Sequence, residues 1–408
     1  MPVKLNTIPD PSLRPSPPRP LPWLGALICF IAAGIILMRF LGKLVGNSAF
    51  WWFAIGIPAG LWIVLAFIRL IIYTLRQLQA NAWDNRREQV ILQEIRRGRR
   101  ALQILSAECL TAHSHDLSFA PITELLQRNE NRILPQNSWN GGNNIRHSRL
   151  PVTVDMSPDA LVLTSVSALL KKLSAFFSLL PLNNAIAVLF ESSSSLPDAK
   201  IEALWQQAWQ QSGICQTFSF IEGQGLAAID HWLDHCIKDK AVLLVVALQV
   251  APEQPEGSAE AVVGLLLGNR LTQSTLSPRG LLHRPEASSA CAEELQAAIL
   301  QATHWVPLPP GALQHLWLSG LTGNSEAWKS AVAAQNNEPL NSIDTKTGLH
   351  DINQFLGNPG CAAPWLAIAA AAQSTFGSPH MIISSEKEGD IVWSTVISPN
   401  ASHKENKT

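Results

Sequence analysis

Histidine and cysteine side chains offer the most varied chemistry in this chain, and their spacing decides what they can do. His231 and His235 lie in HWLDH, one helical turn apart, so both imidazoles share a helix face and could hold a metal ion with a third ligand. No further histidine or cysteine cluster lies near them, and the HExxH glutamate of metalloproteases is missing. The pattern favours a polar helix face, and we expect no metal site and no cofactor.

The cysteines are six, widely spread and without a CxxC pair. That pattern is typical of buried thiols in a reducing compartment. Cys361 begins an apolar run that ends at Ala372 and contains Pro364. Twelve residues are too few to span a bilayer, so we expect a buried helix and interpret Cys361 as a small core residue rather than a nucleophile.

Beyond residue 150, continuous apolar runs alternate with helical stretches. Apolar runs of this kind are typical of strands buried on both faces, which predicts a layered α/β domain. The predicted strands are 185–190, 217–221, 241–250, 261–268 and 381–385, and the predicted helices are 198–213 and 291–303. MIISSEKEGDIVWSTVI reads as a β-hairpin closed by a polar turn.

Four local signatures occur in an order that resembles the thiolase and β-ketoacyl synthase families. EGQGLAAIDHWLDHCIKDKAVLLVVALQVAP (222–252) is similar to their tight turn, central helix and core strand. PEGSAEAVVGLLLGN (255–269) resembles the EGA-type strand, and LWLSGLTGNSEAW (316–328) resembles the HGTGT segment. NQFLGNPGCAAPWLAIAAA (353–371) is similar to the KxxxGH turn and following helix. The resemblance covers residues 150–400 and implies a thiolase-like layered fold and a homodimer.

That family uses a cysteine nucleophile at a helix N-terminus and two histidines that stabilise the oxyanion. The resemblance places Glu222 and Gly223 where the cysteine turn would be, Ser319 and Asn358 at the two histidine positions, and Asn353 at the lysine position. None of these residues can carry an acyl group as a thiolate does. The resemblance therefore implies a pseudoenzyme with no catalytic residue.

Two uncharged apolar segments precede this domain, Leu21–Met38 and Ala49–Ile68, and each is long enough to cross a bilayer. Arginine and lysine are concentrated before the first and after the second, whereas the connection offers only Arg39 and Lys43. We therefore expect two transmembrane helices in a bacterial inner membrane, with both termini and the C-terminal domain in the cytoplasm.

The expected organisation has six parts. They are a Pro-rich tail (1–20), two transmembrane helices (21–76), a basic helical stalk (77–126), a linker (127–150), the thiolase-like domain (151–400) and a C-terminal tail (401–408). In the stalk, six arginines are expected to face the membrane lipids: Arg86, Arg87, Arg96, Arg97, Arg99 and Arg100. Positive charge beside a span also follows from orientation alone, so both interpretations stay open. The Pro-rich tail reads as a stiff tether or a docking peptide.

The function expected from these features is that of a non-catalytic structural or interaction protein at the inner membrane, with an unidentified protein partner. The Pro-rich start, two spans and basic stretch 83–105 also weakly resemble membrane proteins that accompany type VI secretion gene clusters. The alternative is a membrane-associated acyltransferase acting on acyl-thioesters, with Cys361 or Cys215 paired with His235 or His350. The acidic balance after residue 110 excludes free nucleic acid as a partner of the C-terminal domain.

Overall fold

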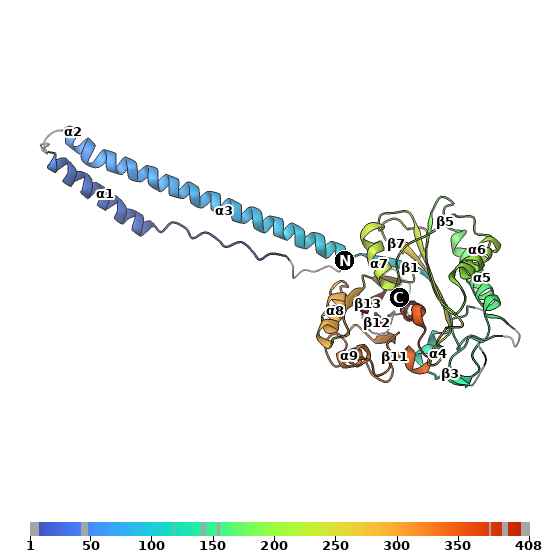
Figure 1. The fold of residues 1–408 in the computed structure, drawn as a ribbon. Coiled ribbons are helices and arrows are strands. Elements are labelled where there is room, and N and C mark those ends of the chain that lie inside the picture. The colour runs from blue at the N-terminus through green and yellow to red at the C-terminus, as the bar shows by residue number, and fades with distance from the viewer. Residues whose placement is uncertain are drawn as a thin grey trace, which may run out of the picture. The chain divides into compact units, whose positions relative to one another are not determined.

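A computed structural model describes residues 8–41, 48–117, 119–139, 141, 144–152, 156–374, 377–385 and 391–400. The chain divides into two compact units, Lys4–Ile95 and a second that includes Arg96–Thr408. Figure 1 shows the helices and strands of both units.

The first unit is a helical hairpin. Its elements are α1 (Pro20–Phe40), α2 (Ser48–Trp51), the π-helical turn η2 (Trp52–Gly56) and the start of α3 (Ile57–Gly98). The two arms pack closely, because a Cβ atom on Gly34 would lie 2.4 Å from the Ala54 carbonyl oxygen and 2.7 Å from Pro58. Further along, Trp62 Nε1 donates to the Trp23 carbonyl at 2.8 Å.

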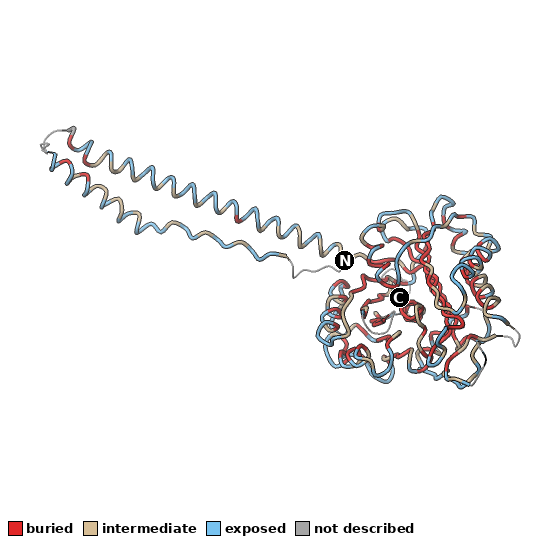
Figure 2. Tube along the Cα trace, in the orientation of Figure 1, coloured by how far each residue is buried: buried red, intermediate tan, exposed pale blue. Residues whose placement is uncertain are grey.

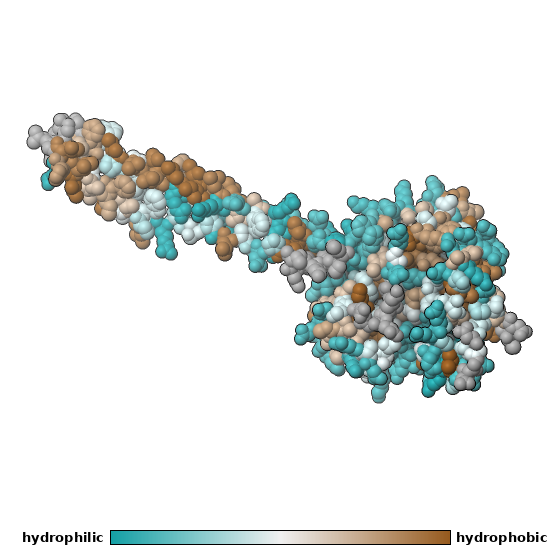
Figure 3. Space-filling view, in the orientation of Figure 1, coloured by the Kyte–Doolittle hydropathy of each residue, from teal (hydrophilic) through white to brown (hydrophobic). Residues whose placement is uncertain are grey.

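Apolar side chains cover the outside of this hairpin. Figure 3 shows them over α1 and the adjoining part of α3, with polar side chains along the rest of α3, and Figure 2 shows that most of the unit is exposed. Pro20–Phe40 and Trp52–Gly98 are both long and apolar enough to cross a membrane. A third helix of that composition, Pro158–Phe177, is partly buried in the second unit.

The second unit is built on one long sheet, with strand order β11-β10-β12-β13-β8-β1-β7-β6-β4-β5 and β9 pairing beside β13. The first-half strands are β1 (Ala101–Leu110), β4 (Ile186–Ser193), β5 (Phe218–Phe220), β6 (Val242–Gln249) and β7 (Ala261–Asn269). The second-half strands are β8 (Gly280–His283), β9 (Glu286–Ser288), β10 (His315–Ser319), β11 (Leu349–Asp351), β12 (His380–Ser385) and β13 (Val392–Pro399).

The two halves repeat one topology. Leaving β9 aside, the strands of each half, numbered in chain order, stand in the sheet as third, second, fourth, fifth and first. In both halves the second strand pairs in parallel with the third and fourth, and the fifth is antiparallel to its neighbours. β1 and β8 pair antiparallel and join the halves. The fold is therefore an internal duplication.

Helices form three layers around the two halves of the sheet. The outer layers are α5 (Pro158–Phe177) with α6 (Asp198–Gln211), and α8 (Ala292–His304) with α9 (Glu326–Ala334); the central layer is α7 (Gly225–His235) with α11 (Ala363–Ser374). Along β6, Leu243 and Val245 face the central layer, whereas Leu244 and Val246 face the outer one. The predicted layered α/β domain with strands buried on both faces is thus confirmed.

Two predictions about the front of this unit need correction. The helical stalk was expected to reach residue 126, but α3 ends at Gly98 and Ala101–Leu110 is the fully paired strand β1. The predicted linker 127–150 holds the small hairpin β2 (Leu134–Gln136) and β3 (Ile145–His147), after the short helix α4 (Thr123–Gln127). Long-range pairing of β1 with β7 and β8 overrode the helical pattern of its sequence.

Candidate functional site

The first wall of the candidate site is the turn between β5 and α7. Gly223 (φ +128°) and Gly225 (φ +50°) adopt backbone conformations that favour glycine, which lets the chain turn sharply into the helix. A Cβ on Gly223 would also lie 3.0 Å from the Ala228 side chain. Glu222, Gly223 and Gln224 are exposed on this turn. The predicted tight turn before a central helix is confirmed.

Glu191, near the end of β4, holds this turn to the other half of the domain. One carboxylate oxygen accepts from the Gly225 backbone N–H at 2.5 Å, and the other accepts from Trp365 Nε1 at 2.9 Å. Gly225 begins α7 and Trp365 lies in the first turns of α11, so one buried carboxylate links both central helices. The partial positive charge of the α7 N-terminus favours an anion there.

The second wall is the turn before α11. It runs through the short helix α10 (Ile352–Phe355) and the 3-10 turn η3 (Gly360–Ala362). Gly360 (φ +56°) is required, since a Cβ there would lie 1.9 Å from Oε1 of the buried Gln249. Cys361 follows, half-buried, and its thiol donates to the Leu248 carbonyl at 3.3 Å.

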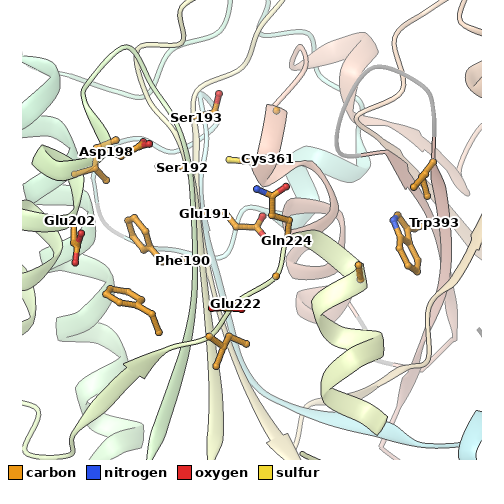
Figure 4. A pocket seen from close by; sticks show the side chains of 17 residues that line it. Phe190, Glu191, Ser192, Ser193, Asp198, Glu202, Glu222, Gln224, Cys361 and Trp393 are labelled. Carbon is orange, nitrogen blue, oxygen red and sulfur yellow. The ribbon is translucent and has the colours of Figure 1, made fainter. Parts of the chain in front are cut away.

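A cleft of about 1440 Å³ lies between these turns, β4 and α6. In Figure 4, Glu191, Gln224 and Cys361 lie at its centre, and Asp198 and Glu202 stand on the α6 side. Four carboxylates line it, and no lysine or arginine is among the described lining residues. The described lining residues are Phe190, Glu191, Ser192, Ser193, Asp198, Ile201, Glu202, Phe220, Ile221, Glu222, Gly223, Gln224, Ala227, Gly360, Cys361, Ile391 and Trp393.

The structure brings only part of the predicted set to this cleft. Glu222 and Gly223 line it, whereas Asn353 and Asn358 hydrogen-bond nearby backbone groups and Ser319 lies outside the lining. Asn353 accepts from Gly320 N at 2.8 Å and donates to the Leu321 carbonyl at 3.0 Å, so it fixes the loop after β10. The Asn358 side chain accepts from Gly360 N at 3.0 Å, and Ser319 is fully buried at the end of β10.

The alternative cysteine–histidine pairs are not assembled at the cleft. His235 lies at the last residue of α7, whereas the cleft contacts the opposite end of that helix. His350 is buried in β11, where its Nε2 lies 3.0 Å from Nδ1 of His315. Cys215 is exposed between α6 and β5. Among the described residues, no group of three His, Cys, Asp or Glu side chains is arranged to hold a metal ion.

Two of the predicted lipid-facing arginines, Arg97 and Arg100, belong to the second unit and form their contacts within it. Arg97 forms a bidentate ion pair with Asp234, near the end of α7. Arg100 donates to the Leu233 carbonyl at 2.8 Å, and Arg284, fully buried, also pairs with Asp234 at 2.6 Å. The expectation that Arg97 and Arg100 face lipid is therefore corrected, because a buried carboxylate and a helix C-terminus engage them.

Several lining residues escaped the sequence analysis. Glu191 had a signal, since a carboxylate at the end of the apolar run IAVLF is unusual for a buried strand. No sequence signal marked Asp198 and Glu202 as cleft residues, because acidic residues in the first turns of a helix are common. Cys361 was assigned to the core, yet it lines the cleft.

Comparisons with known proteins agree with the duplicated topology. No family model and no curated protein matches the chain. Among solved structures, the chain is similar to the oxazolomycin ketosynthase domain OzmH KS8 of Streptomyces albus (12% identity, 74% of this chain and 96% of that chain, TM-score 0.49). It is also similar to human mitochondrial 3-ketoacyl-CoA thiolase in complex with CoA (10%, 74% and 99%, TM-score 0.46).

A third similar structure is the peroxisomal 3-ketoacyl-CoA thiolase of Saccharomyces cerevisiae (12% identity, 74% of this chain and 98% of that chain, TM-score 0.45). It is described as five layers, α-β-α-β-α, built from two core domains of identical topology. This chain has the same succession of layers and the same kind of repeat. The strand order and the three helix layers by themselves define the second unit as a layered α/β fold with two halves of one topology.

The expectation of a pseudoenzyme is wrong as a classification. The proteins with similar structures are described as ketosynthases and thiolases, which are enzymes. Cys361, which the alternative interpretation names as a possible nucleophile, also lines the cleft. Replacement of residues at the motif positions is therefore no ground for classifying the domain as a non-enzyme.

Proposed function

We propose that this chain is a membrane-anchored interaction protein whose thiolase-like domain binds a cationic segment of a protein partner in its cleft. The observation that carries this proposal is the charge of the lining, with Glu191, Asp198, Glu202 and Glu222 and no described basic residue. Carboxylates along one cleft focus a negative potential that attracts cations and repels phosphate-bearing ligands. Phe190, Phe220 and Trp393 add aromatic surface for guanidinium or ammonium groups.

A basic peptide tests the proposal. Full-length protein in nanodiscs of zwitterionic lipid is titrated with fluorescent octa-arginine, followed by anisotropy. Glu202→Gln with Glu222→Gln should weaken binding about tenfold, since each exposed charge pair contributes up to about 1 kcal/mol. The control removes two exposed carboxylates of the outer helices α8 and α9, Glu293 and Glu326. Equal affinity for both double variants would reject the cleft as the binding site.

The anchor in this proposal is the helical hairpin, with both of its ends in the cytoplasm. Support comes from Ser12, whose backbone N–H donates to Asp84 at 2.9 Å. Residues before α1 and residues late in α3 are thus in contact, as they would be if both lay on one side of a bilayer. Maleimide labelling of intact cells should reach a cysteine placed within residues 42–47 and should not reach Leu13→Cys. The reverse pattern would refute this orientation.

The pathway in this proposal is accessory to a type VI secretion system in the bacterial inner membrane. Its support is the sequence layout of Pro-rich start, apolar hairpin and basic stretch 83–105. Deleting the chain from a strain with an active system should lower killing of competitor cells, and re-expression should restore it. Unchanged killing would remove the pathway and leave the binding proposal standing. We also propose a homodimer, which sedimentation in detergent would test.

Cys361 favours a second candidate, acyl transfer from a thioester. Its thiol would attack the thioester carbonyl, the carbon–sulfur bond of the donor would break, and the proton would pass to the released thiol. Incubation with a radiolabelled acyl-thioester should then label the full-length protein, and Cys361→Ala should abolish the label. Cys291→Ala, at an exposed cysteine that does not line the cleft, is the matched control. Equal labelling of both variants would exclude Cys361 as the acceptor.

A further inference from the structure

The proline-rich segment before α1 is not a free tail, because it docks on α3 within the first unit. The Asp84 carboxylate accepts from the Ser12 backbone N–H at 2.9 Å and pairs with Arg14 at 2.8 Å. Ser12 Oγ donates to the Ala80 carbonyl at 3.2 Å. Figure 1 shows this segment running alongside α3.

Two side chains of α3 donate further hydrogen bonds to the proline-rich segment. Trp83 Nε1 donates to the Asp10 carbonyl at 3.3 Å, and Arg87 Nε donates to the Pro9 carbonyl at 2.7 Å. A proline-rich strand has no internal hydrogen bonds, so its carbonyls depend on water or outside donors. Trp83 and Arg87 thus satisfy two carbonyls of this segment. We call residues 9–14 the strap.

The strap contacts Ala80, Trp83, Asp84 and Arg87 of α3, and we call these four residues the seat. Asp84 is the central residue of the seat. The Ser12 N–H and the nearby Arg14 guanidinium hold the pKa of Asp84 below its ordinary value. The carboxylate is thus charged at neutral pH and Arg14 is its cationic partner. The Arg14 side chain is 53% exposed, so another anion can reach it without displacing protein atoms.

A bilayer would supply such an anion. Arg14 lies six residues before Pro20, where the first membrane-length helix begins, which is about 19 Å of extended chain. Anionic headgroups attract an arginine near the surface by about 1 kcal/mol, comparable with an exposed ion pair. We propose that the strap stays docked on α3 when the surrounding lipid is neutral. It is released when anionic lipid headgroups compete with Asp84 for Arg14. This proposal rests on the membrane anchoring proposed above.

Fluorescence quenching by the native Trp83 tests this proposal. A bimane label is attached at Leu13→Cys, in a full-length chain whose exposed Cys29, Cys215 and Cys291 are serines. The protein is placed in nanodiscs of phosphatidylcholine alone or with phosphatidylglycerol. Docking should quench the label in neutral lipid, and anionic lipid should shift the docked-to-released ratio about fivefold towards the bright form. Trp83→Phe gives the unquenched reference.

Two variants assign the effect to the Arg14–Asp84 pair. Arg14→Gln keeps the Ser12 contacts and should make quenching independent of lipid charge, whereas Asp84→Asn should be bright in both lipids. Arg19→Gln, in the same segment but outside the seat, should respond as the unchanged chain does.

The same quenching in both lipids, or an Arg14→Gln response as large as that of the unchanged chain, would overturn the release mechanism. A bright label in neutral lipid would overturn docking itself. Failure of the anchor is distinguishable, because the protein would not enter nanodiscs and would be extracted from membranes by alkaline carbonate. That result would overturn both proposals.

Discussion

Glu191 shows how one carboxylate can set the geometry of a site without being its ligand. It accepts hydrogen bonds from Gly225 N and Trp365 Nε1, so it connects the first residues of α7 and α11 from its place near the end of β4. The cleft lies beside these contacts. A change at Glu191 should therefore alter stability as well as binding.

Glu191→Gln should destabilise the protein by about 1–3 kcal/mol, because an amide offers one acceptor oxygen and leaves a buried N–H without a partner. Chemical unfolding followed by tryptophan fluorescence measures this loss. Glu293→Gln on the exposed face of α8 should change the free energy of unfolding by less than about 0.5 kcal/mol. Equal small effects for both variants would mean that Glu191 does not hold the two helices.

We predict that acid destabilises the folded protein, because three histidines lie together in the second half of the sheet. His315 and His380 stack at 4.6 Å between ring centroids, and His350 lies beside them. Burial lowers the pKa of His350 to about 4 and that of His380 to about 3, and it also lowers the pKa of His315. The folded state therefore binds fewer protons than the unfolded chain, where histidine titrates near pH 6.5.

The neutral histidines therefore stabilise the folded protein fully above pH 6.5, and this stabilisation is lost as the pH falls towards about 4. Each imidazole should contribute up to about 1.4 kcal/mol per pH unit in that window. His350→Phe, which keeps an aromatic ring beside Trp317, should flatten the slope measured by urea unfolding at several pH values. His304→Gln, at an exposed position, should leave it unchanged, and a slope unaffected by His350→Phe would contradict the assignment.

At the scale of elements, α7 is held at both ends. Glu191 binds its first residue, and Asp234 near its end pairs with Arg97 and Arg284. Burial alone would raise the pKa of Asp234, but hydrogen bonds from Arg97 and Arg284 hold it below its ordinary value. The charged form is therefore the one that the structure stabilises.

Asp234→Asn should cost about 3–5 kcal/mol, because the fully buried Arg284 loses part of its counter-charge. Thermal unfolding of the full-length protein is the measurement. Asp239→Asn, just beyond α7 and exposed, serves as the control. Arg284 also forms an ion pair with Asp230. A loss below about 1 kcal/mol would show that Asp230 alone compensates Arg284.

The hairpin offers a matched pair of glycines on one helix. Gly34→Leu should force α1 away from the Ala54 carbonyl, whereas a Cβ atom at Gly25 would meet no atom within 4 Å, so Gly25→Leu should be tolerated. With cysteines replacing Trp23 and Trp62, disulfide formation should slow at least about tenfold in the first variant and not in the second. Equal rates would contradict close packing at Gly34.

Sequence patterns correctly predicted the elements whose side chains meet apolar neighbours on every side. β6 and β7 read correctly because both faces of each strand meet apolar side chains, and α11 because every side is buried. β1 was read as helix, since its partners Val262–Asn269 and Gly280–His283 lie far along the chain. The cleft could not be predicted for the same reason, because Glu191 and Cys361 come together only when the two halves of the fold assemble.

At the scale of the whole molecule, duplication explains how one domain acquires a central cleft. Each half contributes a turn that leads from its third strand towards a central helix, and the cleft contacts both turns. The halves are not interchangeable, since the first presents Glu222 and the second Cys361. The carboxylates proposed to bind the partner would thus come from the first half, and the thiol from the second.

The burial of α11 has a consequence for biosynthesis. Ala363–Ala372 is enclosed on every side by strands of both halves, and it is followed by β12 and β13, which complete the second half. During translation, the first 350 residues therefore leave the ribosome before α11, so at that stage the central helix layer contains α7 without α11. Premature termination before Ala363 would yield a product with an open interior, which chaperones and proteases would recognise, rather than a shorter working protein.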